Sequence, residues 1–393
     1  MRILTFSSPY PPELGGMQSH VYNLTQAFAR MGHEVRVVTA RSQRSAPVRQ
    51  SDGAIRVVRI PFVNVPKTMT LQYLGASAAY LTWLVLTWRP DILHVHSFWP
   101  DLLVTKHLYP MVPVVHTAHE SLFLMMAEQP SYHRRLRFIM SSVDGVIGPS
   151  NELLHVARGF GVPTGRSIFL PNGVDSERFS PSVHGVVRER YRISPSTKVV
   201  LCPRRLVPKN GVNFLIEGIP TILRIHPDTI FVIVGEGPER AALESQTREL
   251  RVQDKVVFAG GISNDEINGY YAGADLVMLP SLKEATSISA LEAMSCAKPV
   301  VASNVGGLPY LVEDGVTGSL VPPADAQALA TAVSELLSDP ERRNEMGAAA
   351  RSRVLSELTW DHIARRTSEF YSQVLSLRRN GTRIRHSLLA TKE

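Results

Sequence analysis

The chain has 393 residues, of which 44% are hydrophobic and 20% are charged, and its formal net charge is +7. This composition is typical of a folded globular protein, and the length favours two domains over a single core. Two cysteines exclude a disulfide framework, and dispersed basic residues without zinc-finger spacing argue against a nucleic-acid partner. The positive charge favours small anionic partners, such as phosphates and nucleotides, or an acidic membrane surface.

The first elements are a strand, a loop and a helix. RILTFSS predicts a buried strand, YPPELGG a loop, and residues 17–31 a helix that Gly32 ends before the strand EVRVVTA. Gly15 and Gly16 stand immediately before this helix. Glycine there lets a ligand approach the backbone and opens an anion site, although an ordinary turn explains the pair equally well.

Residues 68–88 contain no charged side chain and approach the length of a membrane span. Gln72, Ser77 and several Thr and Tyr hydroxyls dilute this segment, and the apolar strand DILHVHS follows it directly. We therefore expect a buried helix that covers a sheet, rather than a transmembrane helix.

Four histidines stand at the ends of two predicted strands, His94 and His96 in HVHS and His116 and His119 in HTAH. They suggest a zinc site, but no cysteine or acidic cluster completes one. Satisfied buried histidines are the simpler interpretation, and no metal is predicted. His119 is the last of the four before a loop, which makes it the better candidate to touch a substrate.

Residues 122–140, LFLMMAEQPSYHRRLRFIM, mix apolar side chains with Arg134, Arg135 and Arg137. A helix with a solvated basic face explains this pattern. A contact with an anionic membrane or a polyprenyl-phosphate acceptor explains it equally well.

The second half repeats the rhythm of the first. KVVLCPRR predicts a strand, VPKNG a loop, residues 212–226 a helix that Pro220 bends or breaks, and TIFVIVGEG the next strand. KVVFAGG, DLVMLPS and KPVVAS follow as further strands between helices. Continuous β-branched runs separated by helices indicate parallel sheets that are covered on both faces. The fold class is therefore α/β, with two doubly wound domains whose ligands lie outside the carboxyl ends of the strands.

The domain boundary is expected in the Pro/Ser/Gly-containing stretch after PNGVDSERF, between residues 182 and 183. The first domain then covers residues 1–182 and the second 183–358. No strand follows the last helix, residues 359–377, so it can cross back to the first domain. Residues 378–393 form a basic tail that is expected to fray.

Arg204, Arg205 and Lys209 follow the first strand of the second domain in CPRRLVPKNG. A planar guanidinium and a compact ammonium at this spacing suit a pair of phosphate groups. A solvated basic loop is the alternative. Gly235 begins the turn GEGP after the next strand, a weak signal that lacks the dinucleotide-binding fingerprint.

The stretch EATSISALEAMSCAKPVVAS carries two acids, Glu284 at the end of a strand and Glu292 inside a short apolar helix. Backbone N–H groups near Thr286, Ser287 and Ile288 form the start of that helix, which suits a diphosphate. Glu292 needs a partner in such surroundings, and a pair of sugar hydroxyls provides one. A capping acid and a solvated helix glutamate are the alternative.

Together these motifs resemble the GT-B-fold, retaining glycosyltransferases of family 4 over roughly residues 1–375. The resemblance implies two Rossmann-like domains facing across a cleft, the first for the acceptor and the second for a nucleotide sugar, with the last helix crossing back to the first domain. The motifs that carry it are YPPELGG, HVHS, HTAH, PNGVD, RRLVPKNG, VGEGPE and E-x7-E followed by AMSCAKPVVAS.

The resemblance also implies roles for single residues. Glu292 would hold the donor ribose hydroxyls, and Glu284 and His119 would contact the transferred sugar. Arg204 or Arg205, with Lys209, would neutralise the diphosphate and stabilise the leaving group. Many relatives read E-G-F-G where this chain has EATS, so no donor sugar is carried over. The other donor-binding positions would be Gly15, Gly16, Gly235, Gly261, Ile262, Thr286, Ser287 and Ile288.

The function implied is hexosyl transfer from a UDP- or GDP-sugar to a glycan, glycolipid or small-molecule acceptor, with retention of configuration. No D-x-D pair occurs in the chain, so neither a metal nor any other cofactor is expected. The alternatives are a sugar-nucleotide 2-epimerase on the same fold and a non-catalytic nucleotide-sugar-binding subunit. A proline cluster precedes any long apolar run, so no signal peptide is predicted, and we expect a cytoplasmic enzyme, peripheral at the membrane if the arginines contact lipid.

Overall fold

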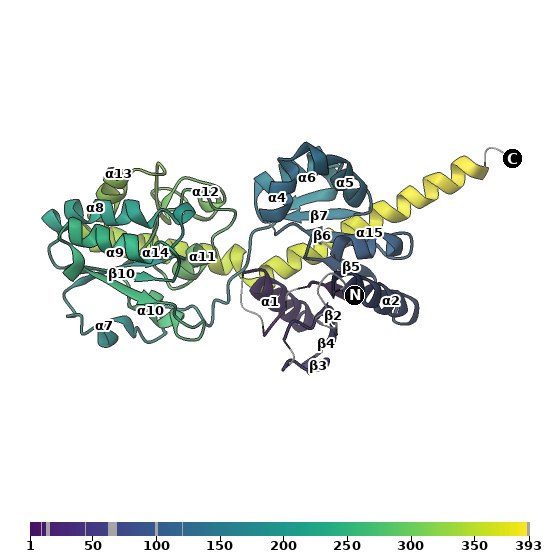
Figure 1. The fold of residues 1–393 in the computed structure, drawn as a ribbon, viewed down its shortest axis with the longest axis horizontal. Helices are drawn as coiled ribbons and strands as arrows, with labels where there is room; N and C mark the ends of the chain where they lie inside the picture. Colours follow the sequence, from purple (N-terminus) through teal and green to yellow (C-terminus); the bar gives the residue numbers. More distant parts are fainter. Residues whose placement is uncertain are drawn as a thin grey trace. The chain divides into compact units, whose positions relative to one another are not determined.

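The computed structural model describes residues 1–8, 10–12, 16–43, 45–61, 69–98, 101–119 and 121–390. These residues fold into two compact units (Figure 1). Unit 1 comprises Met1–Pro171 and the C-terminal segment that begins at Trp360, and unit 2 comprises Asn172–Thr359. The chain therefore first leaves unit 1 at residues 171/172, earlier than the boundary at 182/183 that the sequence suggests.

Unit 1 is built on an eight-stranded sheet with the order β3-β4-β2-β1-β5-β6-β7-β8. Neighbouring strands are parallel except β3 and β4, which form an antiparallel pair at one edge. The strand order reverses between β1 and β5, so the crossovers on either side leave in opposite directions. The strands are β1 (Arg2–Phe6), β2 (Glu34–Ala40), β3 (Arg49–Asp52), β4 (Ile55–Ile60), β5 (Ile92–Val95), β6 (Val114–Thr117), β7 (Gly145–Gly148) and β8 (Ser167–Phe169).

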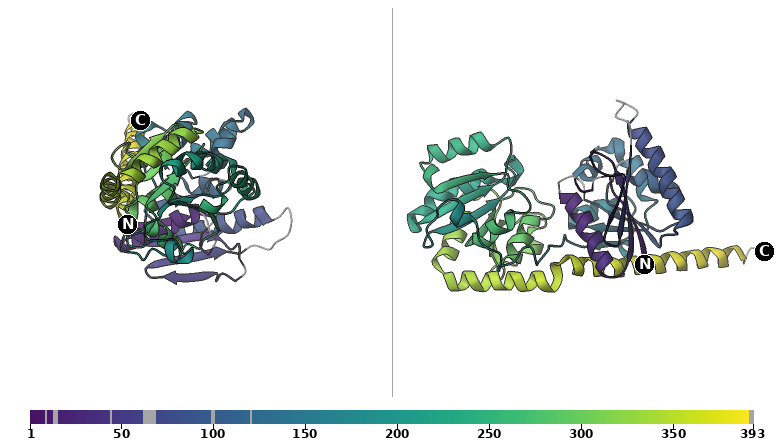
Figure 2. Two further views of the ribbon diagram at one scale, coloured as in Figure 1. Left: turned by 90° about the vertical axis from the view of Figure 1, so that its left-hand side faces the viewer. Right: turned by 90° about the horizontal axis from the view of Figure 1, so that it is seen from below.

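Helices cover both faces of this sheet, as Figure 2 shows for α1 and α2. On one face α1 and α15 pack with Val35 and Val57, and on the other α2 packs with Val38 and Ile60. This alternation is the period of two that a sheet covered on both faces requires. The helices are α1 (Gly16–Arg30), α2 (Met69–Thr87), α3 (Asp101–Val104), η1 (Thr105–Leu108), α4 (Ser121–Ala127), α5 (Pro130–Met140), α6 (Asn151–Gly159), η2 (Thr164–Arg166) and α15 (Trp360–Ala390).

Two of these helices test expectations drawn from the sequence. Helix α2 is the uncharged segment, and it covers the sheet as predicted, with Leu81 and Leu84 buried. No helix among the described residues is long and apolar enough to cross a membrane. Helix α15 belongs to unit 1, where Ile363 and Tyr371 enter the core beside α1. It continues to Ala390, so most of the predicted basic tail is helical.

Unit 2 is built on a six-stranded parallel sheet with the order β11-β10-β9-β12-β13-β14. Here the order reverses between β9 and β12. Continuous apolar runs make these strands, because both of their faces are buried. The strands are β9 (Lys198–Pro203), β10 (Thr229–Val234), β11 (Val256–Gly260), β12 (Leu276–Leu279), β13 (Val300–Ser303) and β14 (Gly318–Val321).

The helices of unit 2 form two layers, with α8, α9 and α13 on one face of the sheet and α10, α11 and η5 on the other. Helix α8 continues through Pro220, where the sequence suggests a bend or a break. The helices are α7 (Val187–Arg190), η3 (Pro208–Asn210), α8 (Val212–Ile225), α9 (Arg240–Glu249), η4 (Gln253–Lys255), α10 (Ile267–Gly273), α11 (Ile288–Ser295), α12 (Leu308–Leu311), α13 (Ala326–Ser338), α14 (Pro340–Arg353) and η5 (Val354–Leu358).

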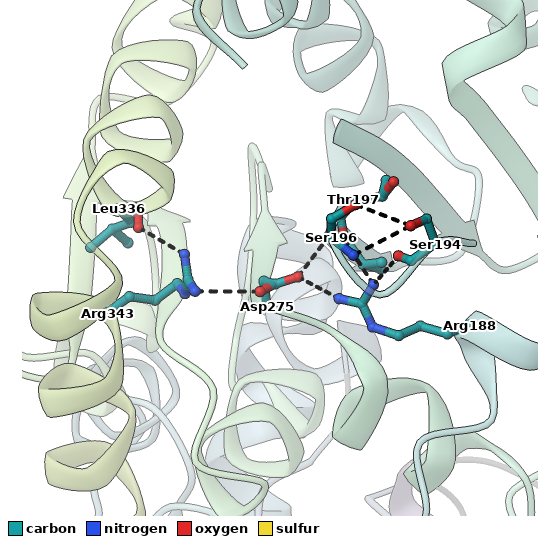
Figure 3. Close-up of polar contacts among 8 residues, drawn as sticks. Arg188, Ser194, Ser196, Thr197, Asp275, Leu336 and Arg343 are labelled. Atoms are coloured by element: carbon teal, nitrogen blue, oxygen red, sulfur yellow. Dashed lines mark hydrogen bonds and ion pairs between the residues drawn. The ribbon is translucent and has the colours of Figure 1, made fainter. Parts of the chain in front are cut away.

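One carboxylate ties β9, β12 and two helices together at the amino end of the sheet (Figure 3). Asp275 accepts hydrogen bonds from Arg188 Nη2 and from the backbone N–H of Val199, both at 2.9 Å. Arg343 on α14 forms an ion pair with its other oxygen at 3.4 Å. Asp275 therefore fixes the starts of the two strands whose far ends carry the predicted diphosphate residues.

Candidate active site

The two loops with the predicted diphosphate residues meet at the carboxyl edge of the unit 2 sheet. β9 ends at Pro203 and leads to Arg204, and β12 ends at Leu279 and leads to Glu284. These strands are neighbours where the strand order reverses. At such a point the two loops turn to opposite faces and leave a crevice at the strand ends. Sheet topology thus joins two motifs that stand far apart in the sequence.

Arg204 and Glu284 form an ion pair in this crevice. Arg204 Nη2 donates to Glu284 Oε2 at 2.5 Å, and the two side chains are 9% and 14% exposed. Arg204 Nη2 also lies 3.4 Å from Ser287 Oγ, and Ser281 Oγ donates to Glu284 at 3.4 Å. Arg204 Nε is buried and has no hydrogen-bond acceptor among the described residues. A buried donor without an acceptor is costly, and a ligand oxygen would satisfy it.

Glycine-containing loops back this pair from two sides. A Cβ on Gly235, where φ is +148°, would lie 2.1 Å from the carbonyl oxygen of Arg204. A Cβ on Gly306, where φ is +55°, would lie 1.5 Å from the carbonyl oxygen of Glu284. Gly235 was predicted as a ligand-binding residue, and here it lets the backbone of β10 approach Arg204. Gly306 is not among the residues predicted from the sequence, although two glycines that follow a strand so closely, in SNVGG, are a signal for close packing.

Helix α11 begins in the crevice, as the sequence predicts. Ser287 is its N-cap, and its Oγ accepts from the N–H of Ala290 at 3.3 Å. Thr286 and Ile288, on either side of the cap, are half-buried. The first N–H groups of the helix remain available to an anion, because a single side chain caps only one of them.

Glu292 lies on the second turn of α11, where it is partly buried. Tyr271, from α10, donates its hydroxyl to Glu292 Oε2 at 2.7 Å. Burial raises the pKa of Glu292 to about 7, although the Tyr271 hydrogen bond acts in the opposite direction. Burial, together with the Glu292 charge, also raises the pKa of Tyr271. Tyr271 was missed in the sequence, where it is one of two tyrosines in an ordinary helical pattern.

The other predicted residues of unit 2 lie on the loops that follow β9 and β11. Arg205 and Lys209 are exposed, so Arg204 is the buried arginine of the pair. The carbonyl of Lys209 accepts from the N–H groups of Leu282 and Lys283 at 2.8 and 3.2 Å, which joins this loop to the one that carries Glu284. Gly261 and Ile262 follow β11, whose last residue accepts the N–H of Gly235 at 2.8 Å.

A cluster of histidines occupies the corresponding place in unit 1, where the order reverses between β1 and β5. His96 follows β5 and His119 follows β6, and His96 Nδ1 lies 3.2 Å from His119 Nε2. His20 comes from α1. The centroid of its ring lies 4.3 Å from that of His119 and 5.1 Å from that of Trp360. His20 was missed because nothing local in α1 marks it, and only the fold brings it to the other two.

Burial favours the neutral form of His96, His116 and His119. Desolvation, reinforced by the neighbouring histidines, lowers the pKa of His96 and His119 well below its usual value. Burial lowers that of His116 to about 4. Neutral imidazoles can each donate and accept one hydrogen bond, which suits sugar hydroxyls.

The histidines that the sequence grouped into a hypothetical zinc site are divided by the structure. His94 is tied to Thr117 and Tyr371, and His116 to the carbonyl of Val95. Within the described ranges, potential ligand atoms lie within 4.8 Å of one another only in His20, His96 and His119. Zn²⁺ accepts such nitrogens, but the hydrogen bond between His96 and His119 engages one nitrogen of each ring.

The remaining predicted residues of unit 1 lie elsewhere. Gly16 begins α1, whereas Gly15 falls outside the described residues. Arg134, Arg135 and Arg137 are exposed on α5.

Two family profiles match the chain. The profile described as "Glycosyltransferase Family 4" covers residues 14–178, and the one described as "Glycosyl transferases group 1" covers residues 186–353. Together they include the histidine cluster of unit 1 and the crevice of unit 2.

Similar proteins agree with these profiles. A glycogen synthase of Mycobacterium tuberculosis is 30% identical over 94% of this chain and 94% of its own. A GDP-mannose-dependent α-(1-6)-phosphatidylinositol monomannoside mannosyltransferase of Mycolicibacterium smegmatis is 37% identical over 60% of each chain. Among solved structures, a sucrose-phosphate synthase of Thermosynechococcus elongatus matches with a TM-score of 0.78 and 25% identity, over 96% of this chain and 100% of its own.

Proposed function

This chain belongs to the group 1, family 4 glycosyltransferases, and from that premise we propose the reaction that it catalyses. It transfers a hexosyl group from a UDP- or GDP-sugar to a glycan, glycolipid or small-molecule acceptor, with retention of anomeric configuration and without a metal ion. Unit 2 binds the donor and unit 1 the acceptor. The observation that carries the donor site is the buried Arg204–Glu284 pair beside the start of α11.

The diphosphate is bound by Arg204, Lys209 and the first N–H groups of α11. Arg204 Nε lacks an acceptor among the described side and main chains, so a phosphate oxygen there satisfies a buried donor. Exposed Lys209 and Arg205 add further positive charge on the same loop. This arrangement stabilises the charge that develops on the leaving diphosphate, which is the role that a metal ion has in other transferases.

Glu292 binds the ribose hydroxyls of the donor. Tyr271 holds one carboxylate oxygen at 2.7 Å and thereby orients the group. Without a ligand, burial favours the protonated acid, and its pKa of about 7 lies close to physiological pH. Two hydroxyl donors stabilise the ionised form, so nucleotide binding and deprotonation of Glu292 are coupled.

Retention follows from attack and departure on the same face of the sugar. Glu284 is engaged by Arg204 at 2.5 Å, which favours a role in holding sugar hydroxyls over one as a nucleophile. The leaving phosphate then accepts the proton of the attacking hydroxyl, and the new glycosidic bond forms as the bond to the diphosphate breaks. In unit 1 the neutral His119 and its neighbours bind sugar hydroxyls.

The acceptor is proposed to be lipid-linked, and the enzyme to act at a membrane. The mannosyltransferase relative carries a phosphatidylinositol mannoside in its name. On α5 of this chain, Phe138 is 54% exposed beside the three exposed arginines, a combination that suits a lipid-linked acceptor. We therefore propose a cytoplasmic enzyme that works at the membrane face.

Calorimetry with UDP, GDP and ADP in EDTA tests the donor site, with Glu292→Ala as the matched variant. We expect one nucleotide to bind without metal and the variant to lose that binding. If no nucleotide binds, the donor site is wrong. If the nucleotide binds only when Mg²⁺ is added, the proposed metal independence is wrong, but the proposed donor site is not. Incubation of the donor without an acceptor excludes the epimerase alternative if the sugar is recovered unchanged.

A further inference from the structure

The outward face of α2 in unit 1 is apolar from Leu71 to Leu86. None of the residues of α2 is charged. Leu71, Trp83 and Leu86 are 69%, 52% and 59% exposed, and the Tyr80 ring stacks on Trp83 with centroids 5.5 Å apart. Exposed helix faces of globular proteins normally carry charged side chains, so such a stripe of large apolar residues indicates a contact surface.

An arginine-lined hollow of about 300 Å³ adjoins this stripe, between α2 and the edge strands of the sheet. Arg36 on β2 is paired in register with Arg56 on β4, and Arg49 lies on the edge strand β3. Tyr80 and Trp83 line the same hollow from the side of α2. The hollow and the stripe therefore form one continuous surface.

The charges in the hollow are poorly balanced. Glu34, which is 51% exposed, is 3.7 Å from Arg36, and among the described residues neither Arg49 nor Arg56 forms a salt bridge. Arg36 stacks on Trp88 at 4.3 Å, and its buried Nε has no acceptor in the described part of the chain. Like charges opposite each other on neighbouring strands destabilise a sheet, and a bound anion would remove that cost.

We propose that this hollow binds the phosphate of an anionic phospholipid while the apolar face of α2 lies on the bilayer. Arginine is suited to phosphate, and Trp and Tyr beside apolar residues are the composition found at the membrane interface. A soluble phosphate compound would use the arginines but leave the stripe uncovered. A symmetric second copy would bring both arginine clusters into one interface. Binding of an anionic phospholipid here rests on the proposed membrane location of the enzyme. It does not depend on which nucleotide or sugar the enzyme uses.

Vesicle co-sedimentation of the full chain is the first experiment. Phosphatidylcholine vesicles are compared with vesicles that also contain phosphatidylglycerol, at low and high salt. We expect binding to the anionic vesicles, weakened by salt because the charges are partly screened. Excess glycerol 3-phosphate should displace little of the protein, since it provides no surface for α2. Full displacement overturns the lipid in favour of a soluble phosphate compound.

Paired variants assign the binding to this surface. Arg49→Gln with Arg56→Gln removes two exposed charges, and the expected loss is about fivefold for each, or about twenty-fivefold for the pair. Arg365→Gln with Arg379→Gln removes the same charge from exposed positions of α15 and should leave binding within about twofold. Equal losses in the two pairs overturn the proposal. If vesicle binding falls strongly only in the variant that combines Arg134→Glu, Arg135→Glu and Arg137→Glu, the membrane contact lies on α5 and the proposal is wrong.

Trp83 provides a direct reading of the contact. Its emission should shift to shorter wavelength with anionic vesicles, and Trp83→Phe should abolish the shift without preventing sedimentation. An unchanged spectrum excludes α2 from the bilayer. If the protein dimerises without vesicles and Trp83→Gln abolishes the dimer, the stripe is an interface between two copies and the proposal is wrong. Nucleotide calorimetry on the same variants separates these outcomes from failure of the donor site.

Discussion

Replacing Glu292 with glutamine should stabilise unit 2 at neutral and alkaline pH while weakening nucleotide binding. In the ligand-free protein, burial raises the pKa of Glu292 from 4.5 to about 7. Below pH 4.5 the carboxyl is protonated in both the folded and the unfolded chain and contributes no pH dependence. Between these values the folded state retains a proton that the unfolded state releases, so the free energy of unfolding falls as pH rises.

The difference between the unfolded pKa of 4.5 and the folded pKa of about 7 corresponds to about 3 kcal/mol in the free energy of unfolding. This contribution to stability is lost completely above the folded pKa. Glutamine has no charge to desolvate, and its oxygen still accepts from Tyr271. The variant should therefore match the wild type at pH 4.5 and exceed its stability by up to about 3 kcal/mol at pH 8. Nucleotide affinity should rise with pH through about 7 in the wild type, because ribose hydroxyls favour the ionised acid, and this rise should be absent in the variant.

Hydrogen exchange of the β9 and β12 amides, from pH 4.5 to 8 and corrected for intrinsic rates, measures the stability of unit 2. The four tryptophans all belong to unit 1, so tryptophan fluorescence follows the other unit and should not respond to the substitution. Parallel curves for the two proteins across this range would refute the argument that Glu292 is destabilised by burial. If Glu292→Gln is less stable than the wild type at pH 8, the ionised carboxylate stabilises the fold and the predicted effect has the wrong sign.

Three further predictions concern unit 2. Arg204→Gln should weaken binding of the donor nucleotide by about 2 kcal/mol, roughly thirtyfold in calorimetry, because a charged donor to the diphosphate is lost; Arg224→Gln, at an exposed position of α8, is the control, and equal effects would remove Arg204 from the site. Gly306→Ala should destabilise unit 2 by about 3 kcal/mol and weaken nucleotide binding, since the new Cβ overlaps the Glu284 carbonyl; an unchanged melting temperature would contradict this. Asp275→Asn should cost about 3 kcal/mol in urea unfolding, because Arg343 and Arg188 lose a mostly buried counter-ion, while nucleotide affinity in the folded protein should change little; a selective loss of affinity would link this junction to the site.

Local sequence determined the elements that frame the candidate site of unit 2. Continuous apolar runs defined β9, β10 and β12, since the strands are buried on both faces. Ser287 begins α11 because its side chain satisfies a free N–H, and the spacing along the helix places Glu292 on the second turn. These features depend on neighbours in the chain, so a pattern of residues was sufficient to predict them.

Tertiary structure decided which side chains meet. The sequence left Arg204 and Arg205 as equal candidates, and the packing of the first beneath the glycine loops made it the buried partner of Glu284. Tyr271 reaches Glu292 from another helix. His20 joins the histidines of unit 1 in the same way, from α1 to the ends of β5 and β6.

The physical reason is the same in each case. The position of a strand in a parallel sheet is set by crossover connections and by burial of both faces, and these involve residues that lie far apart in the sequence. The sequence by itself therefore determined where the loops with the candidate residues begin and end, because strand ends and helix starts are local features. Only the strand order, with β9 beside β12 and β1 beside β5, decided which of those loops share a site.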